Sequence, residues 1–156
     1  MSPISSLINP ANVALDVSAS DKKALFERIA ELLGGTSGLS RGQIVDSLVA
    51  RERLGSTGLG QGIAIPHGRV KGLREALGAF LRLEPPLAFE APDNRPVNLV
   101  FVLLVPDRAT DLHLQLLSEL AQMFSDRELR SKLAAAPDAL AAQRLIAGWE
   151  VNAPKA

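Results

Sequence analysis

Two histidines are the residues of this chain best suited to group transfer near neutral pH. His67 and His113 are the only histidines among 156 residues, which include neither cysteine nor tyrosine. A side chain that acts as a nucleophile near pH 7 is therefore an imidazole, or a hydroxyl, lysine or carboxylate that its neighbours activate. The ordinary histidine pKa of about 6.5 leaves much of the ring neutral at this pH. Because a phosphorylated imidazole has a good leaving group, such a ring can both accept and release a phosphoryl group.

The sequence around His67 favours this chemistry. Residues 62–68 read Gly-Ile-Ala-Ile-Pro-His-Gly, so we expect the histidine to follow a short apolar strand at 62–65. A glycine-rich loop at 55–61 runs into that strand. Glycines let backbone amides approach an anion without obstruction by side chains. Four residues of this region are the candidates for binding the transferred group: Gly60, Gln61, Gly62 and Gly68.

His113 and Arg51 are the candidates for stabilising phosphoryl oxygens. We expect His113 in the first turn of a helix that Thr110 caps, where free N–H groups and the positive end of the helix dipole favour an anion. Arg51 lies just before the glycine-rich loop, from which it could approach the group. Other roles stay open: His113 could be a half-buried structural residue, and Arg51 could pair with Asp46 or Glu52.

A metal or a nucleotide cofactor fits these residues less well. His67, His113 and Asp111 could in principle bind zinc, but no His-Glu-x-x-His spacing is present. The glycines at 58–62 lack the spacing of a dinucleotide-binding loop, and they precede a strand instead of a helix. We therefore expect neither a metal nor a cofactor.

Composition limits the classes of function. Seventeen basic and 17 acidic residues cancel, and only 4% of the residues are aromatic, so we expect no nucleic-acid binding. The N-terminus does not resemble a signal peptide, and the most apolar run, at 97–106, is too short to cross a bilayer. We expect a cytoplasmic protein without membrane insertion. It should form a single domain over 1–156, with a core at about 4–148 and a flexible tail at 151–156.

Apolar periodicity predicts an α/β fold. Strands are predicted at 12–17, 62–65, 76–83 and 97–105, with Pro85-Pro86 closing the third of these. Helices are predicted from a cap at Ser20 to Gly34-Gly35, from Ser40 with a Gln43 capping box to about Arg53, from Thr110 to Phe124, near 126–135, and near 137–148 with Pro137 in the first turn. Strands and helices interleave, which predicts a mixed β-sheet of about five strands flanked by helices on both faces.

Four segments together resemble the mannitol/fructose-type enzyme IIA domain of the bacterial phosphoenolpyruvate-dependent phosphotransferase system. These segments are Arg51-Glu52-Arg53, the glycine-rich residues 55–60, residues 62–68, and Leu112-His113-Leu114. The resemblance extends from about Ile4 to Gly148. It implies the mixed α/β fold of that family.

The resemblance also implies the roles of the site residues. His67 would be phosphorylated through Nε2, and His113 and Arg51 match the family's second active-site histidine and its active-site arginine. The phosphoryl donor would be a histidine phosphocarrier protein of the HPr or NPr kind, itself charged by enzyme I.

Gln61 favours the nitrogen-type regulatory branch of the family. Residues 59–61 read Leu-Gly-Gln here, whereas the resemblance gives Leu-Gly-Glu for the mannitol branch. We also expect a lone domain without an attached sugar-specific or membrane domain, which would point the same way. In that branch phosphorylation acts as a signal that regulatory target proteins, such as transporters or sensor kinases, recognise. The added charge near His67 would lie beside an apolar rim that we expect Leu59 and Ile65 to form.

Two other functions stay open. The chain could be a sugar-transport enzyme IIA of the fructose/mannitol type, which passes phosphate to a separate IIB domain. It could also be a non-catalytic regulatory binding module in which both histidines are structural.

Overall fold

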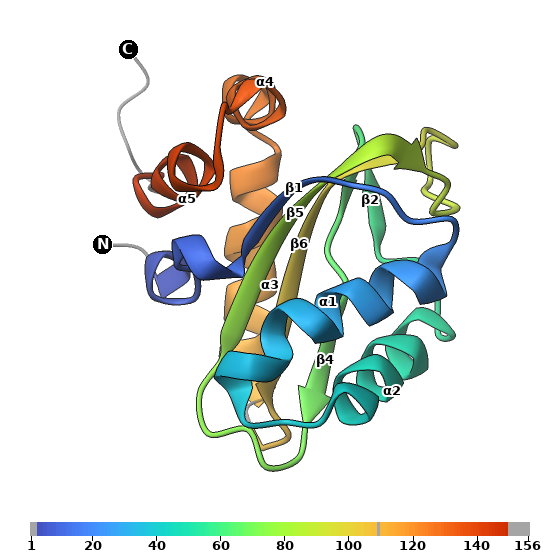
Figure 1. Ribbon diagram of the computed structural model, residues 1–156, viewed down its shortest axis with the longest axis vertical. Coiled ribbons are helices and arrows are strands. Elements are labelled where there is room, and N and C mark those ends of the chain that lie inside the picture. The colour runs from blue at the N-terminus through green and yellow to red at the C-terminus, as the bar shows by residue number, and fades with distance from the viewer. Residues whose placement is uncertain (1–2, 109, 150–156) are drawn as a thin grey trace.

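A mixed β-sheet with helices on both faces forms the protein (Figure 1). The computed structural model describes residues 3–108 and 110–149. Within these residues six strands form one sheet, so the predicted architecture is confirmed with one strand more than expected. The strands are β1 (Val13–Val17), β2 (Gly58–Gly60), β3 (Ile63–Ala64), β4 (His67–Val70), β5 (Leu77–Leu87) and β6 (Val97–Pro106).

Strand β6 is the centre of this sheet. The strand order is β1-β5-β6-β3-β2. Strand β4 also pairs with β6, farther along that strand than β3 does. Strand β5 runs antiparallel to β6, whereas β1 is parallel to β5, and both β3 and β4 are parallel to β6. From Val97 to Val105 the apolar side chains of β6 are at most 2% exposed. The predicted central strand at 97–105 is therefore confirmed, because only a strand covered on both faces buries so continuous an apolar run.

The helices lie in two layers (Figure 1). Helices α1 (Lys22–Ser37) and α2 (Arg41–Glu52) cover one face, and α3 (Thr110–Phe124), α4 (Arg127–Ala135) and α5 (Ala139–Ala147) cover the other. Two short 3-10 helices, η1 (Pro3–Ser6) and η2 (Pro10–Asn12), precede β1.

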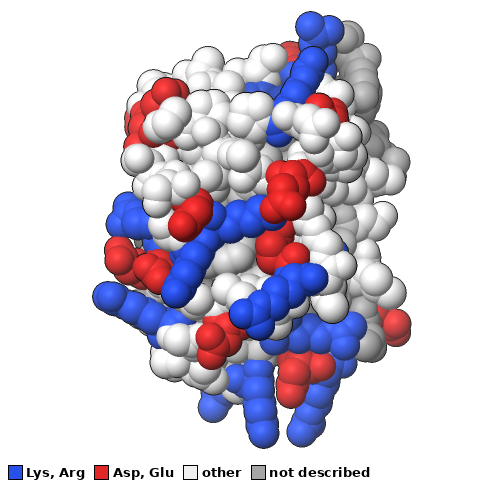
Figure 2. Space-filling view, turned by 90° about the vertical axis from the view of Figure 1, so that its right-hand side faces the viewer, with Lys and Arg blue, Asp and Glu red and all other residues white. Residues whose placement is uncertain are grey.

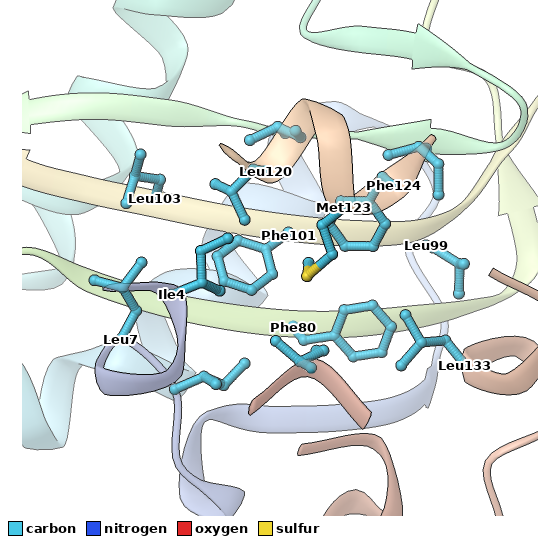
Figure 3. Packing of buried hydrophobic residues seen from close by; sticks show 14 of the residues in the cluster. Ile4, Leu7, Phe80, Leu99, Phe101, Leu103, Leu120, Met123, Phe124 and Leu133 are labelled. Carbon is cyan, nitrogen blue, oxygen red and sulfur yellow. The ribbon is translucent and has the colours of Figure 1, made fainter. Parts of the chain in front are cut away.

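Alternate residues of β6 supply the two cores. Phe101 and Leu103 pack with α3 and η1, and Figure 3 shows Phe101 beside Phe80, Met123 and Phe124. Their neighbours in the strand, such as Val102, pack with α1 and α2. Burying one such side chain stabilises the fold by about 1.5–3 kcal/mol, so this strand holds the two layers in place.

Helix boundaries depend on caps that the sequence shows only partly. The capping box of α2 is confirmed, since Ser40 Oγ accepts from the Gln43 N–H at 3.1 Å. Helix α1 is capped by Asp21 instead of Ser20. It also continues through Gly34-Gly35, because glycine weakens a helix by only about 1 kcal/mol. The helix ends at Ser37, and the C-cap residue Gly38 has a left-handed φ of 73°.

Helices α5 and α3 differ in how well their first residues were predicted. Helix α5 begins at Ala139 behind an Asp138 cap, so Pro137 precedes the helix instead of lying in its first turn. Helix α3 begins at Thr110 as expected. Thr110 was predicted to cap α3 with its side chain, and residues 151–156 were predicted to form a flexible tail. The side chain of Thr110 and residues 151–156 lie outside what the structure describes.

Two strand predictions were wrong in their limits. Strand β5 continues through Pro85-Pro86 to Leu87. Both prolines fall where the register with β6 shifts, so their missing N–H groups remove no regular ladder bond. The glycine-rich loop contains β2, and the strand predicted at 62–65 stops at Ala64, after which Ile65-Pro66 separates it from β4. His67 therefore begins a strand instead of following one.

None of the helices among residues 3–108 and 110–149 is long and apolar enough to cross a bilayer.

Candidate active site

His67 is the first residue of β4 and pairs with Leu103 of the central strand. Its side chain is only 9% exposed, and both ring nitrogens have partners. Nδ1 lies 2.8 Å from the Ile65 carbonyl oxygen, and Arg51 Nε lies 3.1 Å from Nε2. Arginine only donates, so Nε2 accepts from Arg51 and Nδ1–H donates to Ile65. The ring is thereby held as the neutral tautomer with its lone pair on Nε2.

The environment of His67 also favours the uncharged ring. Burial lowers the pKa of His67, the hydrogen bond to the Ile65 carbonyl opposes this shift, and the positive charge of Arg51 lowers the pKa further. Glu52 acts in the opposite direction. Because the net shift is downward, the nucleophilic form of the imidazole predominates at pH 7.

Arg51 connects the end of α2 to His67. Its Nη1 donates to the Gly55 carbonyl at 2.9 Å while Nε donates to His67. Glu52 instead forms an ion pair with Lys22, at 2.8 Å. Arg51 therefore does not pair with Glu52, which was one of the alternatives left open. Its guanidinium is instead held between the Gly55 carbonyl and His67.

His113 lies in the first turn of α3, as predicted, and its ring is 5.2 Å from that of His67 between centroids. Arg69 Nε donates to His113 Nδ1 at 3.4 Å, so neutral His113 carries its hydrogen on Nε2. Among the described residues, Nε2 of His113 is one of three buried side-chain nitrogen and oxygen atoms without a hydrogen-bond partner. A buried N–H without an acceptor is destabilising, and an anionic oxygen placed next to it would accept its hydrogen bond.

A family comparison agrees with this arrangement of two imidazoles and a guanidinium. The model described as "Phosphoenolpyruvate-dependent sugar phosphotransferase system, EIIA 2" matches residues 6–148. The chain belongs to this enzyme IIA family. It is therefore a phosphoryl-transfer component of that system, which confirms the predicted family.

Similar proteins point to the nitrogen-type branch. A nitrogen regulatory protein of Pseudomonas aeruginosa is 42% identical over 141 residues, which cover 90% of this chain and 92% of that protein. The crystal structure of nitrogen regulatory protein IIA-Ntr from Neisseria meningitidis has a TM-score of 0.88 at 45% identity and covers 93% of this chain and 99% of that one. IIA mannitol from Escherichia coli shares the fold, with a TM-score of 0.75 at 22% identity over 89% and 98% of the two chains.

Three of the predicted phosphate-binding residues of this enzyme IIA lie away from His67. Gly60, Gln61 and Gly62 lead into β3, which pairs with β6 at Leu99, whereas His67 pairs with β6 at Leu103. Four residues of strand span about 13 Å. The Gln61 N–H donates to Asp93 at 2.8 Å, and Gly60 and Gln61 line a separate pocket of about 340 Å³. The structure does not bring this turn to the imidazole.

Gly68 has a packing role. A Cβ on this residue would collide with Ser47 of α2. The missing side chain therefore lets β4 approach α2 closely, which holds the two elements that carry His67 and Arg51 against each other.

The apolar rim differs from the expectation. Leu59 is 48% exposed, but Ile65 is 3% exposed and belongs to the core, because it lies between two strands that are both covered. Leu54 and Leu114 are 84% and 66% exposed and lie close in sequence to Arg51 and His113. The apolar surface near the site therefore comes from the end of α2 and the start of α3.

Arg69 is a site residue that was not among the candidates predicted from the sequence. Alternate residues of a strand share a face, so the two-residue spacing from His67 was the available signal. Figure 2 shows Lys and Arg side chains, with acidic side chains among them, at the lower end of the molecule, the end at which Figure 1 places the tip of β4. Exposed carboxylates in the segments around that end are Glu75, Asp107 and Asp111. Exposed cations in the segments around that end are Arg69, Lys71, Arg74 and Arg108.

Metal binding gains no support from the arrangement. In the part of the chain that the structure describes, no group of three or more His, Asp or Glu side chains could hold a metal ion.

Proposed function

We propose that His67 takes up a phosphoryl group through Nε2 from a phosphorylated histidine phosphocarrier protein in the cytoplasm, and that the two states of the chain regulate partner proteins differently. The observation that carries this proposal is the tautomer. Nδ1–H is held by the Ile65 carbonyl, and the lone pair of Nε2 faces the guanidinium of Arg51. Attack on phosphorus needs this lone pair and no prior loss of a proton.

Transfer then proceeds as a displacement between two imidazoles. The Nε2 lone pair of His67 forms the new bond to phosphorus, and the electron pair of the donor's P–N bond returns to the donor ring. The His67 ring becomes positively charged in this step, and the Ile65 carbonyl stabilises that charge through the Nδ1–H bond. Arg51 Nε is freed from Nε2 and turns to a phosphoryl oxygen. The unpartnered His113 Nε2–H donates to another oxygen.

Regulation follows from the change in local charge. A phosphoryl group adds a charge of about −1.5 to −2 near neutral pH. It would bring negative charge to the guanidinium groups of Arg51 and Arg69, in a region where Leu54 and Leu114 are exposed. Target proteins that bind this surface, such as transporters or sensor kinases, would therefore distinguish the two states electrostatically. The relation to nitrogen regulatory proteins at 42% and 45% identity supports a regulatory role over sugar transport.

The test is reconstitution of the transfer. The protein is incubated with phosphoenolpyruvate, enzyme I and a histidine phosphocarrier protein, and the phosphate that it acquires is tested for acid lability and assigned by mass spectrometry. We expect one acid-labile phosphate on His67 and none on His67→Ala, whereas His113→Ala should still be labelled slowly. An absence of label on the wild-type protein, or equal labelling of His67→Ala, would refute the assignment. Discharge onto a sugar-specific IIB domain would favour the transport role.

A further inference from the structure

Glu52 is a buried carboxylate next to the site that the proposed transfer does not use. Its side chain is 8% exposed and lies at the last residue of α2. Thr57 Oγ1 donates to Oε1 at 2.6 Å, the Thr57 N–H donates to Oε2 at 3.1 Å, and Lys22 Nζ donates to Oε2 at 2.8 Å. A single carboxylate thus holds three donors from two distant parts of the chain.

The position of this charge is unfavourable for the helix itself. A carboxylate in the last turn opposes the negative end of the helix dipole. Removing a carboxylate from water also costs free energy unless the group is paired and hydrogen-bonded. Helix stability therefore does not explain a buried glutamate here, and its contacts point to the segment that it holds.

One connection runs from Glu52 to Arg51. The carboxylate bonds to Thr57 tie the end of α2 to residues 55–57, which turn back on the helix. The Gly55 N–H also donates, at 3.2 Å, to the main-chain carbonyl of Glu52, a bond that does not depend on the side chain. The Gly55 carbonyl in turn accepts from Arg51 Nη1. The loop that Glu52 closes is therefore the support that aims Arg51 Nε at His67.

A second connection runs from Glu52 to the other side of the imidazole. The Thr57 carbonyl accepts from the Ile65 N–H at 3.0 Å. The carbonyl of Ile65 is the group that fixes Nδ1–H of His67. Thr57 therefore joins the Glu52 carboxylate to the residue that selects the tautomer, and it lies in the same loop as Gly55, which supports Arg51.

We propose that Glu52, held by Lys22, is a positioning residue for phosphoryl transfer, because its carboxylate fixes Thr57 and thereby the loop that supports both partners of the His67 ring. This inference rests on the proposed function, in which His67 is the acceptor. Glu52 touches neither phosphate nor donor; it acts by setting the orientation and the tautomer of the nucleophile. Lys22, which lies 30 residues away in the sequence, pairs with the carboxylate and offsets the free-energy cost of removing it from water.

The test compares Glu52→Ala and Glu52→Gln with Glu90→Gln. Glu90 is the matched control, since it also approaches Lys22 Nζ, at 3.4 Å, but its side chain is 85% exposed. The measured quantities are the single-turnover rate of transfer from the phosphorylated phosphocarrier at saturating and subsaturating donor, and the ¹⁵N chemical shifts of the His67 ring. All variants are compared well below their thermal unfolding midpoints.

For Glu52→Ala we expect the rate at saturating donor to fall by about 10- to 100-fold, the range that a displacement of roughly 1 Å in a reacting group can cost. The donor concentration for half-maximal rate should stay within about twofold. Glu52→Gln keeps an acceptor for Thr57 and should lose less, and Glu90→Gln should match the wild type. The ¹⁵N shifts of Glu52→Ala should show a mixture of tautomers instead of Nδ1–H alone.

A second pair of variants covers the case in which Glu52→Ala folds poorly. Thr57→Val removes the hydroxyl donor to Glu52 Oε1, and Thr57→Ser restores it. We expect slower transfer for the valine variant and near wild-type transfer for the serine variant. A purely structural role would lower the unfolding midpoints but leave the transfer rate of the folded protein and the His67 tautomer unchanged, which would overturn the proposal.

The two proposals fail in different ways. An absence of phosphate on wild-type His67 would refute the proposed function itself. Normal labelling of wild-type His67, together with wild-type transfer by Glu52→Ala and Thr57→Val, would refute the positioning role alone.

Discussion

Replacing Arg51 by methionine is the sharpest test of how the site works. Arg51 makes two hydrogen bonds, from Nε to His67 Nε2 at 3.1 Å and from Nη1 to the Gly55 carbonyl at 2.9 Å. In the proposed transfer the first of these would be exchanged for a bond to a phosphoryl oxygen. A hydrogen bond that involves a charged group is worth about 1.5–3 kcal/mol, which corresponds to a loss of roughly 10- to 150-fold in rate.

The same substitution changes the pH dependence of transfer. The positive charge of Arg51 is one of the influences that lower the pKa of His67, although burial contributes most. Without that charge the pKa of His67 rises, so more rings are protonated and non-nucleophilic at pH 6. The acidic limb of the pH–rate profile should therefore move to higher pH in Arg51→Met.

The assay is rapid-quench measurement of phosphoryl transfer from the labelled phosphocarrier between pH 5.5 and 8. Arg51→Lys is the control, because it keeps the charge but cannot span His67 and Gly55 with one planar fork. It should keep the acidic limb of the wild type while transferring more slowly. Wild-type rates and an unshifted limb in Arg51→Met would show that the guanidinium serves only the fold.

Two further predictions concern stability. Burial is the main cause that lowers the pKa values of His67 and His113. As the pH falls through about 6.5, the histidines of the unfolded chain bind protons before those of the folded chain, so the free energy of unfolding decreases below that pH. Urea titrations should show this decrease. If the free energy of unfolding of a double His→Gln variant falls just as steeply with pH, the two histidines are not its cause. Gly68→Ala forces a Cβ into Ser47 and should destabilise the fold by about 1–3 kcal/mol. Ser47→Gly should recover part of this loss in thermal unfolding, and no recovery would mean that the strain lies elsewhere.

Local signals predicted the fold well where they were sufficient. The run at 97–105 predicts a central strand because it is apolar on both faces, and the Ser40–Gln43 box predicts the start of α2 because both partners lie within one turn. The limits of β5 and β4 could not be predicted in this way. Whether a proline interrupts a strand depends on the register with its neighbour, and register is a property of two segments.

The candidate site shows the same division. His67 was predicted from its local Pro-His-Gly context. His113 and Arg51 were predicted from their places in a first helical turn and before the glycine-rich loop, and the resemblance implied the same partnership. The contacts that orient them join residues far apart in the chain: Lys22 and Glu52 are separated by 30 positions, and Arg69 and His113 by 44. No periodicity records such pairs, so the contacts of Arg69 and Glu52 became visible only in three dimensions, although the spacing of Arg69 from His67 placed both on one face of a strand.

The main chain at His67 is anchored in the deepest part of the sheet. His67 pairs with Leu103, and the Leu103 N–H donates to the Pro66 carbonyl at 3.0 Å, so the backbone beneath the imidazole belongs to the same hydrogen-bonded ladder as the buried β6. In the proposed transfer, His67 would therefore accept and release the phosphoryl group at one fixed position. A donor and a target protein that both contact this ring would then exclude each other, so they would compete for the same surface.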